Sequence, residues 1–395
     1  MPARATAPRV KTTRKVALVV EASRSYGRGV LRGIEHSAGT RSKWSLLHQE
    51  MTIDTVLSEW IRESAIDEVI ARVHPLTVDS LRDLDVPCVD VQCRGDFPGI
   101  PQVETDDRKV TELAFEHLGE RGFRRFAFCG YQFAHYSEAR LGCFRELVRE
   151  ASCSLSVYET PESRGAPVTR IEQTDPEDSK KMSAWLASLE PPTGLFVCND
   201  IREQQVRKLF QTLNLSVPDD IGVIGVEDDD TICPLSNPPL SSVQPNSEQV
   251  GYRAAEVLDA VMHGSSASQA VQYVSPEEVV QRLSTQVIAV EDREVARVCR
   301  FIREHACDGI DVHDVADFTS LPRRQLERRF RTELNRTPHE VTATQVAKVK
   351  QLLLEPEITL EQIAPLAGYR HKERLSAVFR REVGEAPGEY RKRRK

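Results

Sequence analysis

The stretch Gly194-Leu-Phe-Val-Cys198, followed at once by Asn199-Asp-Ile-Arg202, decides the fold of most of the chain. Its apolar run has the length of a buried strand. The residues that follow, 203–213, repeat apolar side chains at helical spacing. A wholly apolar strand followed by a helix is typical of a parallel sheet that is covered on both faces.

The same alternation extends over the first 285 residues. Apolar runs occupy 16–20, 44–47, 68–71, 86–91, 125–129, 155–158, 194–198 and 222–226. Helical patterns occupy 29–38, 55–63, 78–84, 110–120, 138–150, 180–188, 203–213 and 250–262. Two such sheets joined by crossovers fit this length, so we predict an α/β domain over 15–285, which the resemblance described below implies to be two-lobed.

The charge of the chain is unevenly distributed. The 395 residues hold 53 Lys and Arg against 60 Asp and Glu, a net charge of −7, and 40% of them are hydrophobic. This composition predicts a folded protein of two or three domains and excludes a disordered one. Residues 291–395 hold 22 basic and 18 acidic residues. An acidic module joined to a basic C-terminal module is therefore expected.

Other classes of protein are disfavoured by what the sequence lacks. The nine cysteines form no Cys-x-x-Cys pair, which favours reduced thiols in a cytosolic protein over a disulfide framework or a metal site. No apolar run approaches the ~20 residues of a membrane span. We expect 1–14 to be a disordered leader, with a transit peptide as the alternative.

Polar and aromatic residues follow several of the predicted strands, where ligands bind in such folds. Carboxylates, guanidinium groups and aromatic rings are the groups that bind sugar hydroxyls and cover a sugar ring. The predicted sugar-binding residues are Glu21, Tyr26, Arg28, Asp106, Tyr136, Arg140, Asp200, Arg202, Glu227 and Asp228.

Two features leave enzymatic alternatives open. Gly27-x-Gly29-x-x-x-Gly33 follows a strand and opens a helix, as a dinucleotide-binding loop does, although its spacing is not Gly-x-Gly-x-x-Gly. The carboxylates could serve a glycosidase, but no general acid is set apart from the others. We therefore expect a cluster of glycines at a helix start, no enzyme, no cofactor and no metal.

Several segments of this half resemble the effector domain of lactose-repressor-type regulators and of periplasmic sugar-binding proteins. They are 103–106, 114–127, 199–200, 217–228, 239–243 and 251–255, in the expected order. The resemblance implies a periplasmic-binding-protein-like sensor in which Asp106, Arg140, Asp200, Glu227 and Asp228 contact the sugar. Glu227 stands where that family usually has Asp, so the pocket would be smaller or the ligand different.

After residue 284 the alternation gives way to helical periodicity. Helices are predicted over 292–305, 312–318, 323–334, 338–354, after the capping residue Thr359, and over 372–383. Two of them, 323–334 and 372–383, each follow a short helix and a turn and expose Arg, Lys, His and Gln. The predicted DNA-binding residues are Arg323, Arg324, Gln325, Arg328, Arg329, His371, Lys372, Arg374 and Arg380. The alternative is a pair of solvated charged helices.

This half resembles the AraC-type DNA-binding domain with two helix-turn-helix units. The resemblance rests on Leu326 and Phe330, on 363–369, and on Phe379, Gly384, Pro387 and Tyr390-Arg391. Pro365 is a departure, since it falls inside a short helix and removes a backbone hydrogen bond there.

A sensor followed by a DNA-binding domain over 286–395 resembles the regulators of pentose operons. The resemblance implies a cytoplasmic, nucleoid-associated bacterial activator that binds double-stranded DNA, RNA polymerase and a pentose, D-xylose above all. It would be a homodimer with no membrane partner. A repressor of another carbohydrate operon and a sugar receptor without DNA binding remain as alternatives.

Overall fold

The computed structural model describes residues 13–41, 44–50, 60–61, 63–73, 78–83, 85–92, 97–160, 176–263, 271–286, 292–310, 312–319, 322–334, 340–353 and 358–393. The chain divides into two compact units, Met1–Val287 and Ile288–Lys395. Over the described ranges, no helix is both long and apolar enough to cross a membrane.

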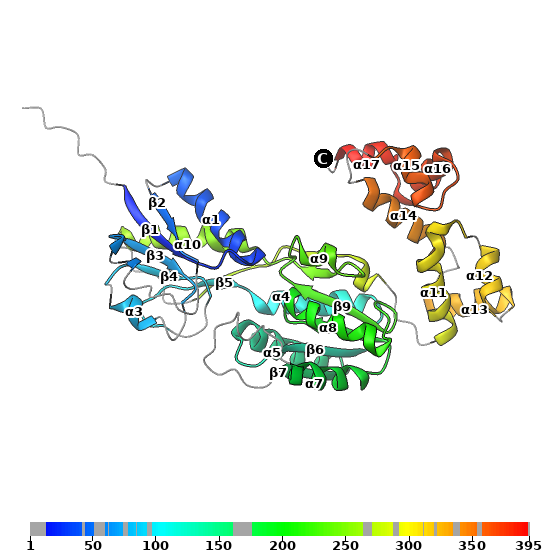
Figure 1. The fold of residues 1–395 in the computed structure, drawn as a ribbon, viewed down its shortest axis with the longest axis horizontal. Coiled ribbons are helices and arrows are strands. Elements are labelled where there is room, and N and C mark those ends of the chain that lie inside the picture. The colour runs from blue at the N-terminus through cyan, green and yellow to red at the C-terminus, as the bar shows by residue number, and fades with distance from the viewer. Residues whose placement is uncertain are drawn as a thin grey trace, which may run out of the picture. The chain divides into compact units, whose positions relative to one another are not determined.

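The first lobe of the first unit is built on a parallel sheet of four strands in the order β2-β1-β3-β4. The strands are β1 (Arg14–Val19), β2 (Trp44–His48), β3 (Glu68–Ala71) and β4 (Cys88–Asp90). Helices α1 (Ser25–Arg41) and α10 (Ser247–Met262) cover one face, and α3 (Val78–Arg82) lies against the other (Figure 1). Apolar residues face both ways from these strands, as the all-apolar runs predict.

The second lobe is built on six strands in the order β12-β10-β9-β8-β6-β7. They are β6 (Arg125–Tyr131), β7 (Ser154–Thr160), β8 (Thr193–Val197), β9 (Ile221–Val226), β10 (Ser241–Val243) and β12 (Val279–Val280). The pairs are parallel except for that of β10 with β12. Its helices are α4 (Asp107–Glu120), α5 (His135–Glu150), α7 (Pro176–Ala187), α8 (Asp200–Leu213), α9 (Ile232–Leu235) and the 3-10 turn η1 (Leu283–Thr285).

The two lobes are joined by chain crossovers. One enters β5 (Val103–Thr105), one runs from β10 to α10, and one returns through β11 (Gln272–Val274), which pairs with β5. The predicted two-lobed α/β sensor fold is thereby confirmed. The predicted helix over 55–63 and the leader over 1–14 lie largely outside the described residues, although Arg14 already belongs to β1.

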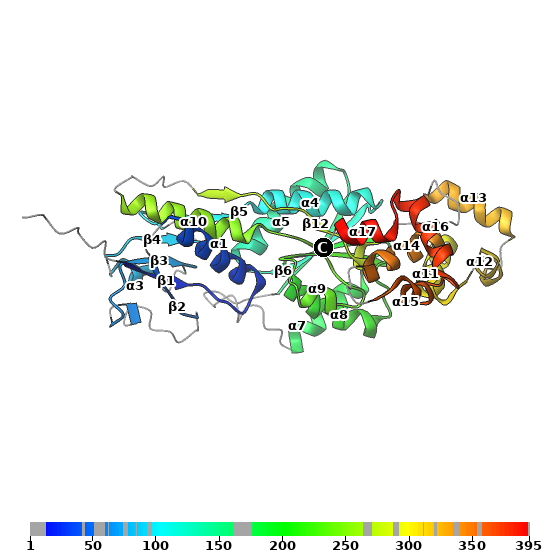
Figure 2. The same cartoon turned by 90° about the horizontal axis from the view of Figure 1, so that it is seen from above.

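The glycine cluster near the N-terminus serves helix packing. Helices α1 and α10 run side by side (Figure 2). A Cβ atom on Gly33 would lie 1.8 Å from the backbone oxygen of Glu248, and one on Gly251 would lie 1.9 Å from that of Val30. Because no side chain fits at either position, Gly33 and Gly251 allow the close contact between α1 and α10.

The second unit consists of helices. In the described residues they are α11 (Arg293–His305), the 3-10 turn η2 (Ala306–Asp308), α12 (Val312–Phe318), α13 (Arg323–Leu334), α14 (Glu340–Leu353), α15 (Leu360–Leu366), α16 (Lys372–Val383) and α17 (Pro387–Arg393). Leu326 and Phe330 belong to one apolar core, and Leu375 and Phe379 belong to another. Each core therefore supports one helix-turn-helix unit. Helix α15 continues past Pro365 and begins with the predicted capping box at Thr359.

Candidate functional site

A pocket lies between the two lobes of the first unit, beside the carboxyl ends of several strands. The first lobe contributes Glu21, Arg24, Tyr26, Arg72, Val91 and Gln92. The crossover strand β5 contributes Glu104 and Thr105, and the second lobe contributes Asp107, His135, Tyr136, Arg140 and Glu227. The space between them is about 670 Å³ including its opening to solvent.

On the side of the first lobe, the pocket is lined by an acidic and a basic residue that form an ion pair. Glu21 follows β1 and Arg72 follows the neighbouring strand β3, so the two strands bring them side by side, and they form an ion pair. The Arg72 guanidinium also lies 5.8 Å from the centre of the Tyr26 ring. The Tyr26 hydroxyl is 3.1 Å from Oγ1 of Thr105, so this wall reaches the crossover strand β5.

The wall on the second lobe is built around Arg140 at 5% exposure. Its Nε donates to Oδ1 of Asp107 at 2.7 Å, and its guanidinium lies 5.1 Å from the ring of Tyr136. Burial alone would lower the pKa of Arg140, but the Asp107 carboxylate outweighs it, so the pKa is raised and the guanidinium stays charged. A buried fixed charge of this kind is a rigid donor for a ligand oxygen.

The pocket as a whole is rich in acceptors. Glu21, Glu104, Asp107 and Glu227 bring four carboxylates to it. The Glu104 carboxylate, 3.6 Å from Nδ1 of His135, raises the pKa of that imidazole. Carboxylates accept from hydroxyl groups, guanidinium groups donate to them, and tyrosine rings cover an apolar face. The arrangement suits a small, uncharged, hydroxyl-rich molecule. Over the described part of the chain, no cluster of His, Cys, Asp or Glu could hold a metal ion.

The structure brings half of the predicted sugar-binding residues together in this pocket. They are Glu21, Tyr26, Tyr136, Arg140 and Glu227.

Three predicted residues lie beside the pocket without lining it. Asp106 caps α4, where its side chain accepts from the backbone N–H of Lys109. Arg28 donates to Asp230 across the lobes at 3.3 Å. Asp228 forms an ion pair of 2.7 Å with Arg282.

Asp200 and Arg202 lie in the interior of the second lobe. Asp200 accepts from the backbone N–H of Asp229 and from the Ser242 hydroxyl, at 2.9 and 2.8 Å. Burial raises the pKa of Asp200 to about 7. Arg202 is fully buried, its guanidinium 4.6 Å from the ring of Tyr131. From the start of α8, Asp200 faces the loop that follows β9, whereas Arg202 faces β6 and β7 and donates to Oγ1 of Thr160 at 2.7 Å.

The sequence interpretation missed several lining residues. Ligand contacts are expected directly after the strands, which we call the strand-end rule. Arg72 directly follows the predicted strand 68–71, so this rule would have found it. Asp107 is next to the predicted Asp106, and the rule cannot choose between neighbours. The same rule finds Gln92, which directly follows the predicted strand 86–91. No sequence signal marks His135, which enters the pocket from the first turn of α5.

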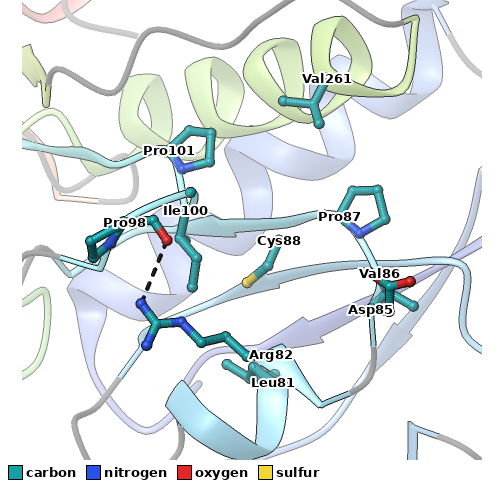
Figure 3. A pocket seen from close by; sticks show the side chains of 11 residues that line it. Leu81, Arg82, Asp85, Val86, Pro87, Cys88, Pro98, Ile100, Pro101 and Val261 are labelled. Atoms are coloured by element: carbon teal, nitrogen blue, oxygen red, sulfur yellow. Dashed lines mark hydrogen bonds between the residues drawn. The ribbon is translucent and has the colours of Figure 1, made fainter.

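A larger hollow lies elsewhere on the first lobe, between the start of β4 and α10. It encloses about 1060 Å³ with its open mouth. Figure 3 shows Cys88, Ile100 and Val261 around it, with the Arg82 guanidinium turned aside to donate to the backbone oxygen of Pro98. Since it lacks convergent polar groups, the interlobe pocket is the better ligand site despite being smaller.

The candidate nucleic-acid interface lies on α13 and α16. Exposed side chains on or beside these helices are Arg324, Arg328, His371, Lys372, Arg374 and Arg380. Gln325 is half-buried, and the side chain of Arg323 lies outside the described residues.

Two of the predicted DNA contacts have partners within the unit. Nη1 of Arg329 lies 3.0 Å from the carboxylate of Asp292, which also caps α11. Lys372 forms an ion pair with Glu361 of α15. Arg329 therefore ties α13 to α11, and the more exposed Arg324 and Arg328 are better placed to meet DNA.

Comparison with known proteins agrees with both halves. Residues 115–285 match the family model of the periplasmic binding protein-like domain, and residues 315–393 match that of a helix-turn-helix domain. Together with the fold and the pocket, these matches define a sugar-responsive transcriptional regulator.

Several relatives extend over nearly the whole chain. The chain is 30% identical over 387 residues to the xylose operon regulatory protein of Haemophilus influenzae, covering 95% of this chain and 98% of that protein. It is 29% identical to the protein of the same name from Escherichia coli, covering 95% and 96%. The chain belongs to the family of the xylose operon regulatory proteins. A solved structure described as the xylose-binding transcription activator xylR is 28% identical, covers 97% of this chain and 98% of that one, and has a TM-score of 0.77.

Proposed function

We propose that this chain activates pentose-utilisation genes and that its effector is D-xylose. The observation that carries the proposal is the interlobe pocket, whose carboxylates, guanidinium groups and tyrosine rings suit a small polyol. The names of the relatives that span the whole chain favour D-xylose as the sugar, and the name of the solved neighbour favours activation.

The sugar would bridge the lobes. Glu21, Tyr26 and Arg72 would contact it from the first lobe, and Tyr136, Arg140 and Glu227 from the second. A ligand held from both sides binds the closed arrangement more tightly than the open one, so it shifts the population towards closure.

The DNA-binding surface would be α13 and α16, each placed in the major groove of double-stranded DNA. As a homodimer, the chain would meet two half-sites, and as an activator it would contact RNA polymerase. This role places it in the bacterial cytoplasm at the nucleoid, and we expect no turnover of sugars. The working division is a leader over 1–14, a sensor over 15–285 and a DNA-binding domain over 286–395.

Calorimetry with the full chain tests the effector. Among D-xylose, L-arabinose, D-ribose and D-glucose, D-xylose should bind most tightly. Glu227→Gln should weaken binding by about tenfold or more, because it removes a charged acceptor from the pocket. Glu120→Gln, at the far end of α4, is the matched control and should bind like the wild type. Absence of binding to all four sugars would refute the proposal.

Gel shifts with and without D-xylose separate the alternatives. An activator of this kind should bind its DNA more tightly with the sugar, and the affinity should fall steeply with salt. A sugar that lowers DNA affinity would favour the repressor. Sugar binding without any salt-dependent DNA binding would favour a receptor module.

A further inference from the structure

The loop after β9, residues Glu227–Asp230, consists of four consecutive acidic residues, and we call it the acidic loop. Its first residue lines the interlobe pocket. The backbone φ is +111° at Glu227 and +47° at Asp228, and both values lie outside the region that residues other than glycine prefer. Such conformations persist where the surrounding structure imposes them, and they concentrate at functional sites.

The end of the acidic loop connects the two lobes. The backbone N–H of Asp229 donates to Asp200 at 2.9 Å, which fixes the loop to the second lobe. The Asp230 carboxylate accepts from Arg28 of α1, at 3.3 Å, which reaches it from the first lobe. A change in the separation of the lobes therefore acts directly on this loop.

The second residue of the acidic loop connects it to the end of the sensor. Oδ1 of Asp228 lies 2.7 Å from Nη1 of Arg282, with side-chain exposures of 16% and 20%. Arg282 opens a segment, Arg282–Gln286, that we call the exit segment, because the second unit begins at Ile288. Arg282 also donates to the backbone oxygen of Leu240, so its guanidinium has a fixed direction.

The rest of the exit segment is held by strands β9 and β10 and by α4. The Ser284 hydroxyl donates to the backbone oxygen of Val223 at 2.6 Å, and Oγ1 of Thr285 lies 2.7 Å from the Ser241 hydroxyl. The backbone oxygen of Thr285 accepts from Arg121 at 2.9 Å. The exit segment therefore lies against β9, the strand that leads into the acidic loop, and against the neighbouring strand β10.

We propose that the acidic loop and Arg282 transmit sugar binding to the DNA-binding unit. A sugar bound by Glu227, together with the lobe closure sensed by the Arg28–Asp230 pair, moves the strained backbone at Asp228. The ion pair of Asp228 with Arg282 then repositions the exit segment. This inference rests on the proposed function, since it requires a sugar in the pocket. Arg282 is a positioning residue, because it lies outside the pocket lining.

The test compares the full-length wild type with Arg282→Gln and Asp228→Asn, where Asn tolerates the left-handed backbone. The ligand is D-xylose. The DNA is a fragment that the wild type selects from a random pool in the presence of D-xylose. Both variants should bind D-xylose within about threefold of the wild type, yet the ratio of their DNA affinities with and without sugar should fall towards one. Arg282→Lys, which keeps the charge, should recover part of the response.

Arg14→Gln is the matched control, since it removes a different 2.7 Å ion pair, with Glu68 of the first lobe. It should respond to D-xylose like the wild type. A normal sugar response in both Arg282→Gln and Asp228→Asn overturns this inference alone, and so does a loss of D-xylose affinity of more than about tenfold in Arg282→Gln, which would assign that residue to the pocket. A wild type whose DNA affinity ignores D-xylose overturns the proposed function and this inference together.

Discussion

At the scale of single residues, Asp200 and Glu227 differ in what their removal should do. Asp200→Ala leaves the Asp229 N–H and the Ser242 hydroxyl without an acceptor, so the free energy of unfolding should fall by about 1–3 kcal/mol. The folded variant should lose less D-xylose affinity than Glu227→Gln, whose side chain lines the pocket. Denaturant unfolding and calorimetry measure the two effects. If Asp200→Ala has normal stability but no affinity for D-xylose, Asp200 contacts the sugar, as the sequence predicts.

The arginines of α13 should also separate into two groups. Arg324→Ala should weaken DNA binding by about 1–3 kcal/mol if its exposed side chain reaches a base. Arg329→Ala should instead lower the stability of the second unit, because it leaves Asp292 without its partner at 3.0 Å. Gel shifts and thermal melting of the two variants, side by side, distinguish these roles. Equal losses of DNA affinity would place Arg329 on the interface as well.

The strand-end rule located the pocket but could not assign every residue in it. Asp106 and Asp107 are neighbours, yet the first caps α4 and the second pairs with Arg140 in the pocket. The difference depends on where the helix begins, and that depends on the side chain that satisfies its first N–H groups. Arg28 lies in the first turn of α1 and Asp228 in the loop after β9, and they meet partners across the lobes and in the exit segment. Those partners are distant in sequence.

At the scale of elements, long periodic segments were predictable and short ones were not. The helix predicted from 110 begins at Asp107, and the one predicted from 203 begins at Asp200, because apolar periodicity starts one turn inside a capped helix. Strands β5, β10 and β11 have three residues each, too few to show a period. The antiparallel strand β12 depends on tertiary pairing with β10.

The contact between helix α4 and the exit segment should make the free energy of unfolding depend on pH. Nε2 of His117 is 2.7 Å from Oγ1 of Thr285, and burial, with the nearby Arg121, lowers the pKa of His117 to about 3. The unfolded chain takes up this proton near pH 6.5 and the folded chain does not. The free energy of unfolding is therefore highest above pH 6.5 and decreases as the pH falls, by about 2 kcal/mol at pH 5.

Unfolding of the chain at pH 7, 6 and 5 measures this loss. His117→Gln should show a shallower dependence on pH over this range, because it has no group to titrate there. His263→Gln, which changes an exposed histidine after α10, should keep the slope of the wild type. An unchanged slope in His117→Gln would mean that other groups govern the acid sensitivity.

At the scale of the whole molecule, the net charge of −7 averages two unlike parts. The acidic residues of the first part include the four carboxylates of the pocket and the acidic loop. The basic residues of the second part include the exposed arginines of α13 and α16. The overall charge therefore says little about DNA binding, and the distribution along the chain says much more.

Sugar and DNA binding should be linked reciprocally in the full chain. If D-xylose raises the affinity for DNA by some factor, saturating DNA must raise the affinity for D-xylose by the same factor, because both describe one coupling free energy. We expect a factor of about 5–150, the usual range of such couplings. Calorimetric titrations of D-xylose with and without DNA give one factor, and gel shifts with and without D-xylose give the other. Two unequal factors at the same salt and protein concentration would show that a further equilibrium, such as dimerisation, takes part in the response.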